Sequence, residues 1–146
     1  MGTRIMRKID VFRGLAQELA GLSTCKRASV GCVIVPRDFS QVYAIGYNGP
    51  PAGLDNNRCT GIQGQCGCVH AEANATIKLQ TTDMDCRLIT TTCPCPACAA
   101  LIINKGCIQH VLYLVEYRLT EGAQLLVDAG IEVQHYTTDL ERWWND

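Results

Sequence analysis

Two short motifs that lie far apart in the chain have to meet in the folded protein. The first is Cys68-Val-His70-Ala-Glu72 and the second is Pro94-Cys95-Pro-Ala-Cys98. Both motifs contain side chains that bind metals, but neither motif alone supplies the three protein ligands of a catalytic zinc site. A fold that suits this sequence must therefore bring residue 70 close to residues 95 and 98.

The spacing of Cys95 and Cys98 is typical of the first turn of a helix. Residues three apart share a helix face, and a helix that begins at Pro94 would carry both sulfur atoms on one side. The positive end of the helix dipole favours the thiolate form of cysteine, which is the form that binds a metal. We therefore expect both sulfur atoms to be metal ligands.

His70 precedes a second helical stretch, which we expect over residues 71–79 because these are mostly good helix formers. Residues two apart do not share a helix face, so His70 and Glu72 are not a pair of ligands of the HExxH kind. At the start of a helix they can still approach a metal from different sides. This leaves Glu72 free to act on a water molecule bound to the metal.

The two motifs together indicate a reaction. A zinc ion held by His70, Cys95 and Cys98 keeps a fourth position for water, whose pKa falls to about 7. The order H-x-E and then P-C-x-x-C is typical of zinc-dependent nucleobase deaminases, in which the glutamate moves protons and does not bind the metal. We therefore expect hydrolytic deamination with Glu72 as the catalytic residue. The alternatives are a structural zinc knuckle and a noncatalytic zinc module used in assembly.

Further residues resemble the deoxycytidylate (dCMP) deaminases of the cytidine and deoxycytidylate deaminase superfamily. Gly46-Tyr47-Asn48-Gly49 is similar to their GYNG loop, and His70-Ala-Glu72-Ala-Asn74 matches their HAExN motif. The resemblance extends from about Ser23 to Val133. It implies conversion of dCMP to dUMP and ammonia, which supplies dUMP for thymidylate synthesis. The alternative substrates are dCTP, a modified dCMP, and a nucleoside or free base.

Hydrophobic periodicity predicts alternating strands and helices in one domain, residues 1–146. We expect helices over 8–22, 71–79, 97–105 and 120–129, and strands over 30–35, 41–46, 86–92, 110–115 and 131–136. The first two strands form a hairpin, and the alternation after residue 68 indicates a largely parallel remainder with helices on both faces. The resemblance implies the same α/β class, a three-layer α/β/α cytidine-deaminase-like fold with a five-stranded mixed sheet.

A second group of cysteines indicates another metal site. Ten cysteines in a chain that we expect to be cytosolic favour metal binding and free thiols over disulfides. The resemblance to phage dCMP deaminases implies a second, structural zinc at Cys25, Cys59 and Cys68, and we infer Cys66 as the fourth ligand. Zinc would also stabilise the expected loop over 46–67, which is rich in glycine and lacks apolar periodicity. Four reduced thiols are the alternative. We expect the remaining thiols to be buried: Cys32, Cys86, Cys93 and Cys107.

The charge balance favours a small-molecule partner. Thirteen basic and fourteen acidic residues leave no cationic surface of the kind that binds nucleic acid. The sequence has no stretch of about twenty apolar residues, which a membrane-spanning helix would need. The N-terminal residues also lack the pattern of a secretory signal. We expect a cytoplasmic protein that binds a free nucleotide, in the host cytoplasm if the chain is encoded by a phage.

Four residues are candidate contacts to the nucleotide. The amide of Asn48 both donates and accepts, which suits a sugar hydroxyl, but Asn-Gly is equally a turn signal. Arg27 could clamp a 5′-phosphate through its planar guanidinium group, with a solvated surface position as the alternative. Tyr117 and Arg118 follow a strand at the end where α/β sheets bind ligands, with surface packing as the alternative.

The resemblance also implies regulation. Members of the family are often hexamers that dCTP activates and dTTP inhibits. Their effector site lies near the loop that corresponds to Gly46, Tyr47, Asn48 and Gly49. We carry effector binding and a hexameric assembly forward as expectations for this chain.

Overall fold

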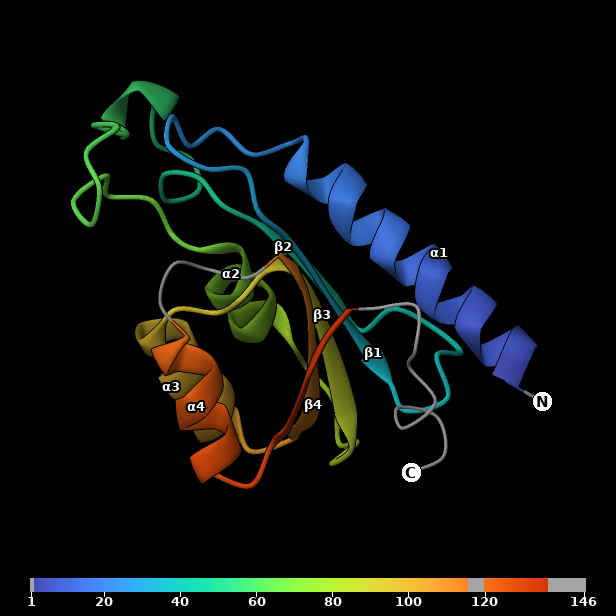
Figure 1. The fold of residues 1–146 in the computed structure, drawn as a ribbon. Coiled ribbons are helices and arrows are strands. Elements are labelled where there is room, and N and C mark those ends of the chain that lie inside the picture. The colour runs from blue at the N-terminus through green and yellow to red at the C-terminus, as the bar shows by residue number, and fades with distance from the viewer. Residues whose placement is uncertain (1, 116–119, 137–146) are drawn as a thin grey trace.

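The computed structural model describes residues 2–115 and 120–136. A five-stranded sheet lies between one helix on one face and three helices on the other (Figure 1). The helices are α1 (Gly2–Ala20), α2 (Ala71–Lys78), α3 (Pro96–Lys105) and α4 (Glu121–Asp128), and the strands are β1 (Gly31–Pro36), β2 (Ala44–Tyr47), β3 (Cys86–Thr92), β4 (Ile108–Val115) and β5 (Glu132–His135). The expected three-layer α/β/α fold is confirmed. None of the described helices has the length and apolar character that crossing a bilayer requires.

The sheet is mixed because its two halves are connected differently. The strands lie in the order β2-β1-β3-β4-β5, and β1 is antiparallel to both of its neighbours. The pairs β3–β4 and β4–β5 are parallel, and α3 and α4 provide the crossover connections that parallel strands require. The short connection from β1 to β2 forms the expected hairpin. Both parts of the predicted topology are therefore confirmed.

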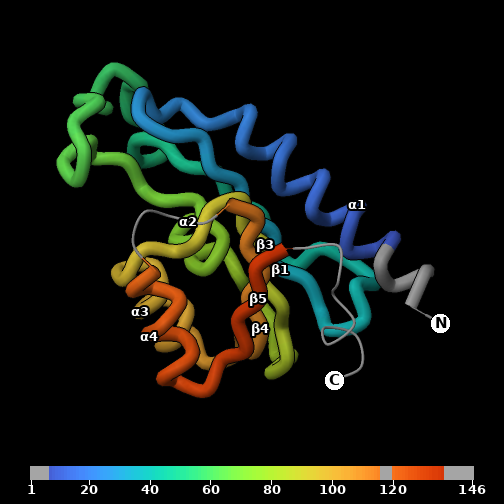
Figure 2. The backbone as a smooth tube through the Cα atoms, viewed as in Figure 1, coloured from blue at the N-terminus to red at the C-terminus, as the bar shows by residue number. Residues whose placement is uncertain are grey.

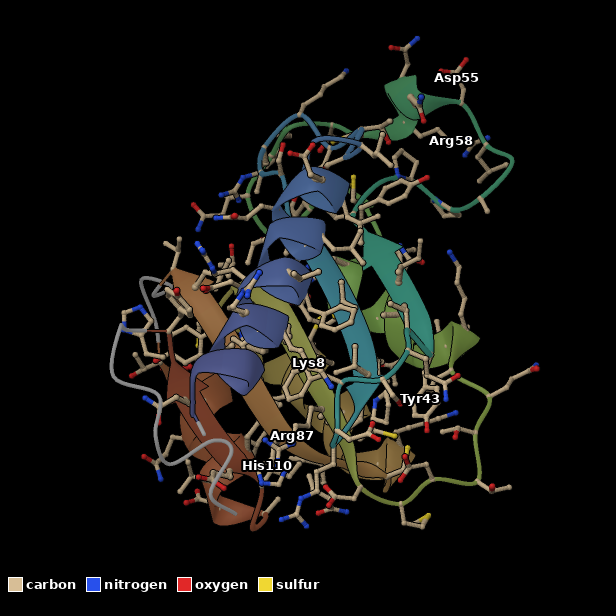
Figure 3. The ribbon with its side chains drawn as sticks, turned by 90° about the vertical axis from the view of Figure 1, so that its right-hand side faces the viewer. Lys8, Tyr43, Asp55, Arg58, Arg87 and His110 are labelled. Carbon is tan, nitrogen blue, oxygen red and sulfur yellow. The ribbon has the colours of Figure 1, made fainter. Side chains whose placement is uncertain are left out.

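Apolar cores cover both faces of the sheet. Successive side chains of a strand point to opposite faces, so Cys32 and Ile34 of β1 join the core beneath α2, α3 and α4. Val33 and Val35 of the same strand pack with α1, which crosses this face of the sheet in Figure 3. Burial on both sides explains why β1 is a continuous apolar run. The four cysteines that were expected to be buried are all buried: Cys32, Cys86, Cys93 and Cys107.

The helix predicted over 97–105 is α3, which begins one residue earlier, at Pro96, and does not have the Pro94 start that would place both cysteines in its first turn. Cys95 is extended, with φ −71° and ψ 165°, and it is the N-cap residue of α3. The reason is Pro96, because a proline ring clashes with a helical conformation of the residue before it. Cys95 therefore lies just outside the first turn, although its Sγ atom still accepts a hydrogen bond from the backbone N–H of Cys98.

The long segment over 48–70 connects β2 to α2 at one end of the sheet. It runs beside residues 21–28, as Figure 2 shows, and the backbone N–H of Thr24 donates to the carbonyl oxygen of Asn48. The segment contains one short 3-10 helix, Asn56–Arg58, and a bridge between Gly49 and Val69. The loop was expected to begin at Gly46, but Gly46 and Tyr47 belong to β2 because they pair with β1.

At Gly46 the strand β2 packs closely against α2, which leads to a prediction about stability. A Cβ atom there would clash with the carbonyl oxygen of Ala71 and lie 2.7 Å from the backbone nitrogen of Ala75. We expect Gly46→Ala to lower the free energy of unfolding by about 1–3 kcal/mol, because α2 has to move. Gly14→Ala is the control, since a Cβ at Gly14 meets no atom within 4 Å and alanine favours a helix. Urea denaturation measures both variants, and equal stability of the two would contradict the prediction.

Candidate zinc and active site

His70, Cys95 and Cys98 converge at the N-termini of two helices. His70 is the N-cap residue of α2, and Cys95 is the N-cap residue of α3. The Nδ1 atom of His70 lies 3.5 Å from Sγ of Cys95 and 3.3 Å from Sγ of Cys98. Two such donor atoms bound to one tetrahedral zinc ion are about 3.5 Å apart. The three donors therefore fit zinc in both chemistry and spacing.

The charges at this point favour a metal. Hydrogen bonds that Cys95 accepts from the side chains of Cys98 and His70 lower the pKa of the Cys95 thiol to about 4. The interaction with Cys95 raises the pKa of His70 above its usual range, and it also raises the pKa of Cys98, as does burial. The negative charge lies on the Cys95 sulfur, which accepts hydrogen bonds from the side chains of His70 and Cys98. A divalent cation would replace the protons of these hydrogen bonds on binding.

Glu72 lies beside the three donors but is not one of them. It is in the first turn of α2, only 5% of its surface is exposed, and burial raises the pKa of its carboxyl group. Its Oε1 atom accepts a hydrogen bond of 2.8 Å from the hydroxyl group of Thr90 on β3. A buried carboxyl group next to a metal site is suited to proton transfer.

A cavity of about 530 Å³ opens beside these residues. His70 and Glu72 line it on one side, and Gln63 and Cys66 of the long segment line it as well. Arg27, from the segment before β1, and Asn48 also line it. Cavities in the range of about 300–1,000 Å³ hold small organic ligands, so the site can admit a substrate next to Glu72.

Cys25, Cys59, Cys66 and Cys68 form a second cluster, in which all four sulfur atoms lie within 4.8 Å of one another. The Sγ atoms of Cys25 and Cys59 are 3.9 Å apart, close to the separation of about 3.8 Å for two sulfur ligands of one tetrahedral zinc. A hydrogen bond from the backbone N–H of Lys26 is the main reason why the pKa of Cys59 falls to about 7. The structure thus brings together all four cysteines that were expected to share a metal.

Comparisons with known proteins agree with this geometry. Residues 6–115 match the family described as "cytidine and deoxycytidylate deaminase zinc-binding region". The chain belongs to this family. The deoxycytidylate deaminase of Saccharomyces cerevisiae is 35% identical over 139 residues, which cover 86% of this chain and 44% of the yeast protein. The deoxycytidylate deaminase of Mycobacterium phage D29 is 37% identical over 120 residues, which cover 71% of this chain and 91% of the phage protein.

A solved structure of another family member is also similar. The dCMP deaminase of cyanophage S-TIM5 in complex with dCMP and dUMP is 32% identical, with a TM-score of 0.77, and the match covers 87% of this chain and 95% of that chain. This chain spans less than half the length of the Saccharomyces cerevisiae and Schizosaccharomyces pombe deoxycytidylate deaminases, 44% and 42% respectively. The family expected from the motifs is confirmed.

In the present chain, Asn48 connects the start of the long segment to residues 23–30 at the cavity wall through hydrogen bonds. Its Oδ1 atom accepts a 2.9 Å hydrogen bond from the backbone N–H of Val30, and its Nδ2 donates at 2.8 Å to the carbonyl oxygen of Ala28. The carbonyl oxygen of Asn48 also accepts from the hydroxyl group of Ser23. An asparagine amide has two donor hydrogens and two acceptor lone pairs, so one of each is left for a ligand.

Of the other candidate contacts, the structure describes only some. Arg27 is exposed and lines the cavity. Tyr117 and Arg118 lie outside the described residues. Of the expected effector loop, Gly46 and Tyr47 are in β2, and Asn48 and Gly49 follow it on the way to the long segment.

Two residues of the site were not among the sequence candidates. Gln63 lines the cavity and belongs to the loop between Cys59 and Cys66, whose sulfur atoms lie close together. Its position could have been anticipated, since Gln63 lies between Cys59 and Cys66, which were expected to meet. Thr90 donates a hydrogen bond to Glu72, although the two residues are 18 positions apart in the sequence. No local pattern distinguishes it from its neighbours Thr91 and Thr92.

Proposed function

We propose that this chain catalyses the zinc-dependent hydrolytic deamination of dCMP, in which dCMP and water give dUMP and ammonia. The observation that carries the proposal is the position of Glu72, a buried carboxyl group beside three zinc donors and an open cavity. A structural zinc site is closed and needs no acid–base group beside it. The similarity to a cyanophage enzyme solved with dCMP and dUMP supports this reaction.

Each residue of the site has a distinct chemical task. His70, Cys95 and Cys98 would hold the zinc ion, which would lower the pKa of a water molecule so that hydroxide is available as the nucleophile at neutral pH. The Glu72 carboxylate accepts a proton from this water and delivers it to the ring nitrogen N3 of cytosine. Glu72 then passes the second proton of the water to the amino group, which leaves as ammonia. The two hydrogens of water are thus divided between the product ring and ammonia.

The monophosphate is the proposed form of the substrate. The cavity admits a small molecule, and Arg27 on its wall offers a guanidinium group that can bind a phosphate through two parallel hydrogen bonds. The near-neutral charge of the chain, with 13 basic and 14 acidic residues, supports a free nucleotide over nucleic acid. Deamination of dCTP, of a modified dCMP, or of a nucleoside or base is the alternative within the same chemistry.

Regulation and assembly are proposed mainly on the resemblance. They comprise activation by dCTP, inhibition by dTTP, a hexameric assembly and a cytoplasmic location. The exposed side chains of Ile45 and Tyr47 on the edge strand β2 are compatible with a subunit contact next to the expected effector loop.

A second, structural zinc at Cys25, Cys59, Cys66 and Cys68 is part of the proposal. Four thiolates form an ordinary closed zinc site, and the spacing of the sulfur atoms supports it. Cys66 and Cys68 also line the cavity. This zinc would therefore stabilise the wall against which the substrate binds, and it would fix the approach of the chain to His70.

Replacement of Glu72 by glutamine tests the reaction. Glu72→Gln keeps the size of the side chain but removes its ability to accept a proton, so we expect ammonia release from dCMP to fall by a factor of at least about 100. Zinc content and thermal stability should not change. The control is Glu121→Gln, the same substitution in the first turn of α4 at an exposed position. If the unmodified protein releases no ammonia from dCMP, dCTP, deoxycytidine or cytosine, the proposed function is wrong.

Replacement of Arg27 by alanine tests the phosphate contact. We expect Arg27→Ala to raise KM for dCMP about tenfold or more while KM for deoxycytidine stays the same, because deoxycytidine has no phosphate. Lys26→Ala is the matched control, since Lys26 is an adjacent exposed cation that does not line the cavity. Steady-state kinetics on both substrates provide the measurement. An equal effect of Arg27→Ala on the two substrates would exclude the phosphate clamp.

Metal analysis tests the second zinc. We expect two zinc ions per chain in the purified protein, and one in Cys59→Ser, which retains the His70 site but binds substrate more weakly because the cavity wall loosens. The control is Cys107→Ala, a buried cysteine outside both clusters, which should retain two ions. A single zinc ion per chain in the unmodified protein would show that the four thiols do not bind the metal.

A further inference from the structure

The strand β3 presents the hydroxyl group of Thr90 to Glu72. Thr90 is fully buried, and its Oγ1 atom lies 2.8 Å from Oε1 of Glu72. It lies directly opposite Cys32 of β1, in the interior of the sheet. Valine has nearly the shape of threonine and favours strands equally well. The hydroxyl group is therefore what distinguishes this position chemically from an ordinary core residue.

The neighbouring groups leave Thr90 as a donor to the carboxylate. The carbonyl oxygen of Thr92 also lies within reach of the hydroxyl group, but at the longer distance of 3.2 Å. An ionised acceptor makes the shorter and stronger hydrogen bond, so the hydroxyl hydrogen points to Glu72. Burial raises the pKa of the nearby Cys32 thiol, which therefore stays neutral and adds no competing charge. The hydroxyl group of the neighbouring Thr91 has another partner, because it accepts a hydrogen bond from the backbone N–H of Gly31.

A carboxyl group of glutamate needs such an anchor for precise proton transfer. The torsion that turns the carboxylate about its last carbon–carbon bond is broad and has no sharp minimum. Proton transfer requires the oxygen to lie within about 2.6–3.2 Å of the proton donor or acceptor. A hydrogen bond to Oε1 restrains this torsion and leaves Oε2 to exchange the proton.

We propose that Thr90 is a positioning residue, whose hydroxyl group donates to Oε1 of Glu72 and holds the carboxylate so that Oε2 faces the reacting water and the substrate. The inference rests on the proposed deaminase function. It assigns to a strand residue outside both zinc motifs a role in the chemical step. It also requires no contact between Thr90 and the substrate, because Thr90 acts only through Glu72.

Kinetics of three variants test the role of the hydroxyl group. We expect Thr90→Val to lower kcat on dCMP by about tenfold to a hundredfold, the value of a hydrogen bond to a charged group, while KM and zinc content stay unchanged. Thr90→Ser keeps the hydroxyl group and should restore kcat to within about threefold of the unmodified enzyme. A purely structural role would instead change thermal stability and KM together.

Thr76→Val is the matched control. Thr76 lies on α2 one turn after Glu72, is buried, and has a hydroxyl oxygen without a hydrogen-bond partner among the described residues. The same substitution at this position removes a buried hydroxyl group from the helix that carries Glu72 without touching the Thr90 bond. We expect Thr76→Val to keep kcat unchanged. A kcat of Thr90→Val within twofold of that of Thr76→Val would overturn the inference.

A measurement on the resting protein separates this inference from the proposed function. In protein labelled with ¹³C at the glutamate carboxyl carbons, the Glu72 resonance is the one that disappears in Glu72→Gln. We expect this resonance to shift in Thr90→Val and to stay in place in Thr90→Ser and Thr76→Val. An unmoved resonance in Thr90→Val would show that the hydrogen bond does not hold Glu72, whether or not the protein deaminates dCMP. A shifted resonance in a protein with no deaminase activity would instead reject the function and the catalytic role, and leave only the contact.

Discussion

The structure depends on the meeting of two helix N-termini at one point. α2 and α3 pack side by side on one face of the sheet, and both begin beside His70 and Cys95. Two positive helix ends that lie together repel each other unless negative charge is placed between them. The Cys95 thiolate supplies this charge, and backbone geometry at the helix starts aims the donors at a common centre. The candidate metal ligands thus stabilise an arrangement that the helices alone would disfavour.

The segment over 48–70 is held by a different kind of interaction. It contributes few residues to the apolar cores, and its contacts include the hydrogen bonds of Asn48, the bridge between Gly49 and Val69, and the cysteine cluster. A segment without a core can change shape at little cost to the rest of the domain. It nevertheless forms the cavity wall and leads directly into His70. The stability of the wall is therefore set locally by the four cysteines, while the sheet and its helices set the position of Glu72.

Local features could be predicted from the sequence, and features that depend on packing could not. The strand β3 covers the predicted residues 86–92, because a segment rich in isoleucine and threonine that is bounded by turn signals favours a strand. The predicted start of α3 at residue 97 differs from the observed start by one residue. The placement of Cys95 in the first turn was wrong, since the restriction that Pro96 places on Cys95 was not weighed against the helical spacing of the sulfur atoms. The ligand clusters follow from motif spacing and from the resemblance. The bond between Thr90 and Glu72 depends on how α2 lies on the sheet, and no sequence pattern encodes it.

The pKa of the Glu72 carboxyl group is set by two opposing influences, burial in the core and the hydroxyl group of Thr90. Burial disfavours the charged carboxylate and raises its pKa, while the hydrogen bond from Thr90 favours the charged form and opposes this shift. A solvated glutamate, with a pKa of about 4.3, would hold a transferred proton too weakly, and an unpartnered buried one would hold it too strongly. Both influences come from residues outside the HxE motif. Two chains with identical zinc motifs can therefore differ in rate according to what their third strand presents to the glutamate.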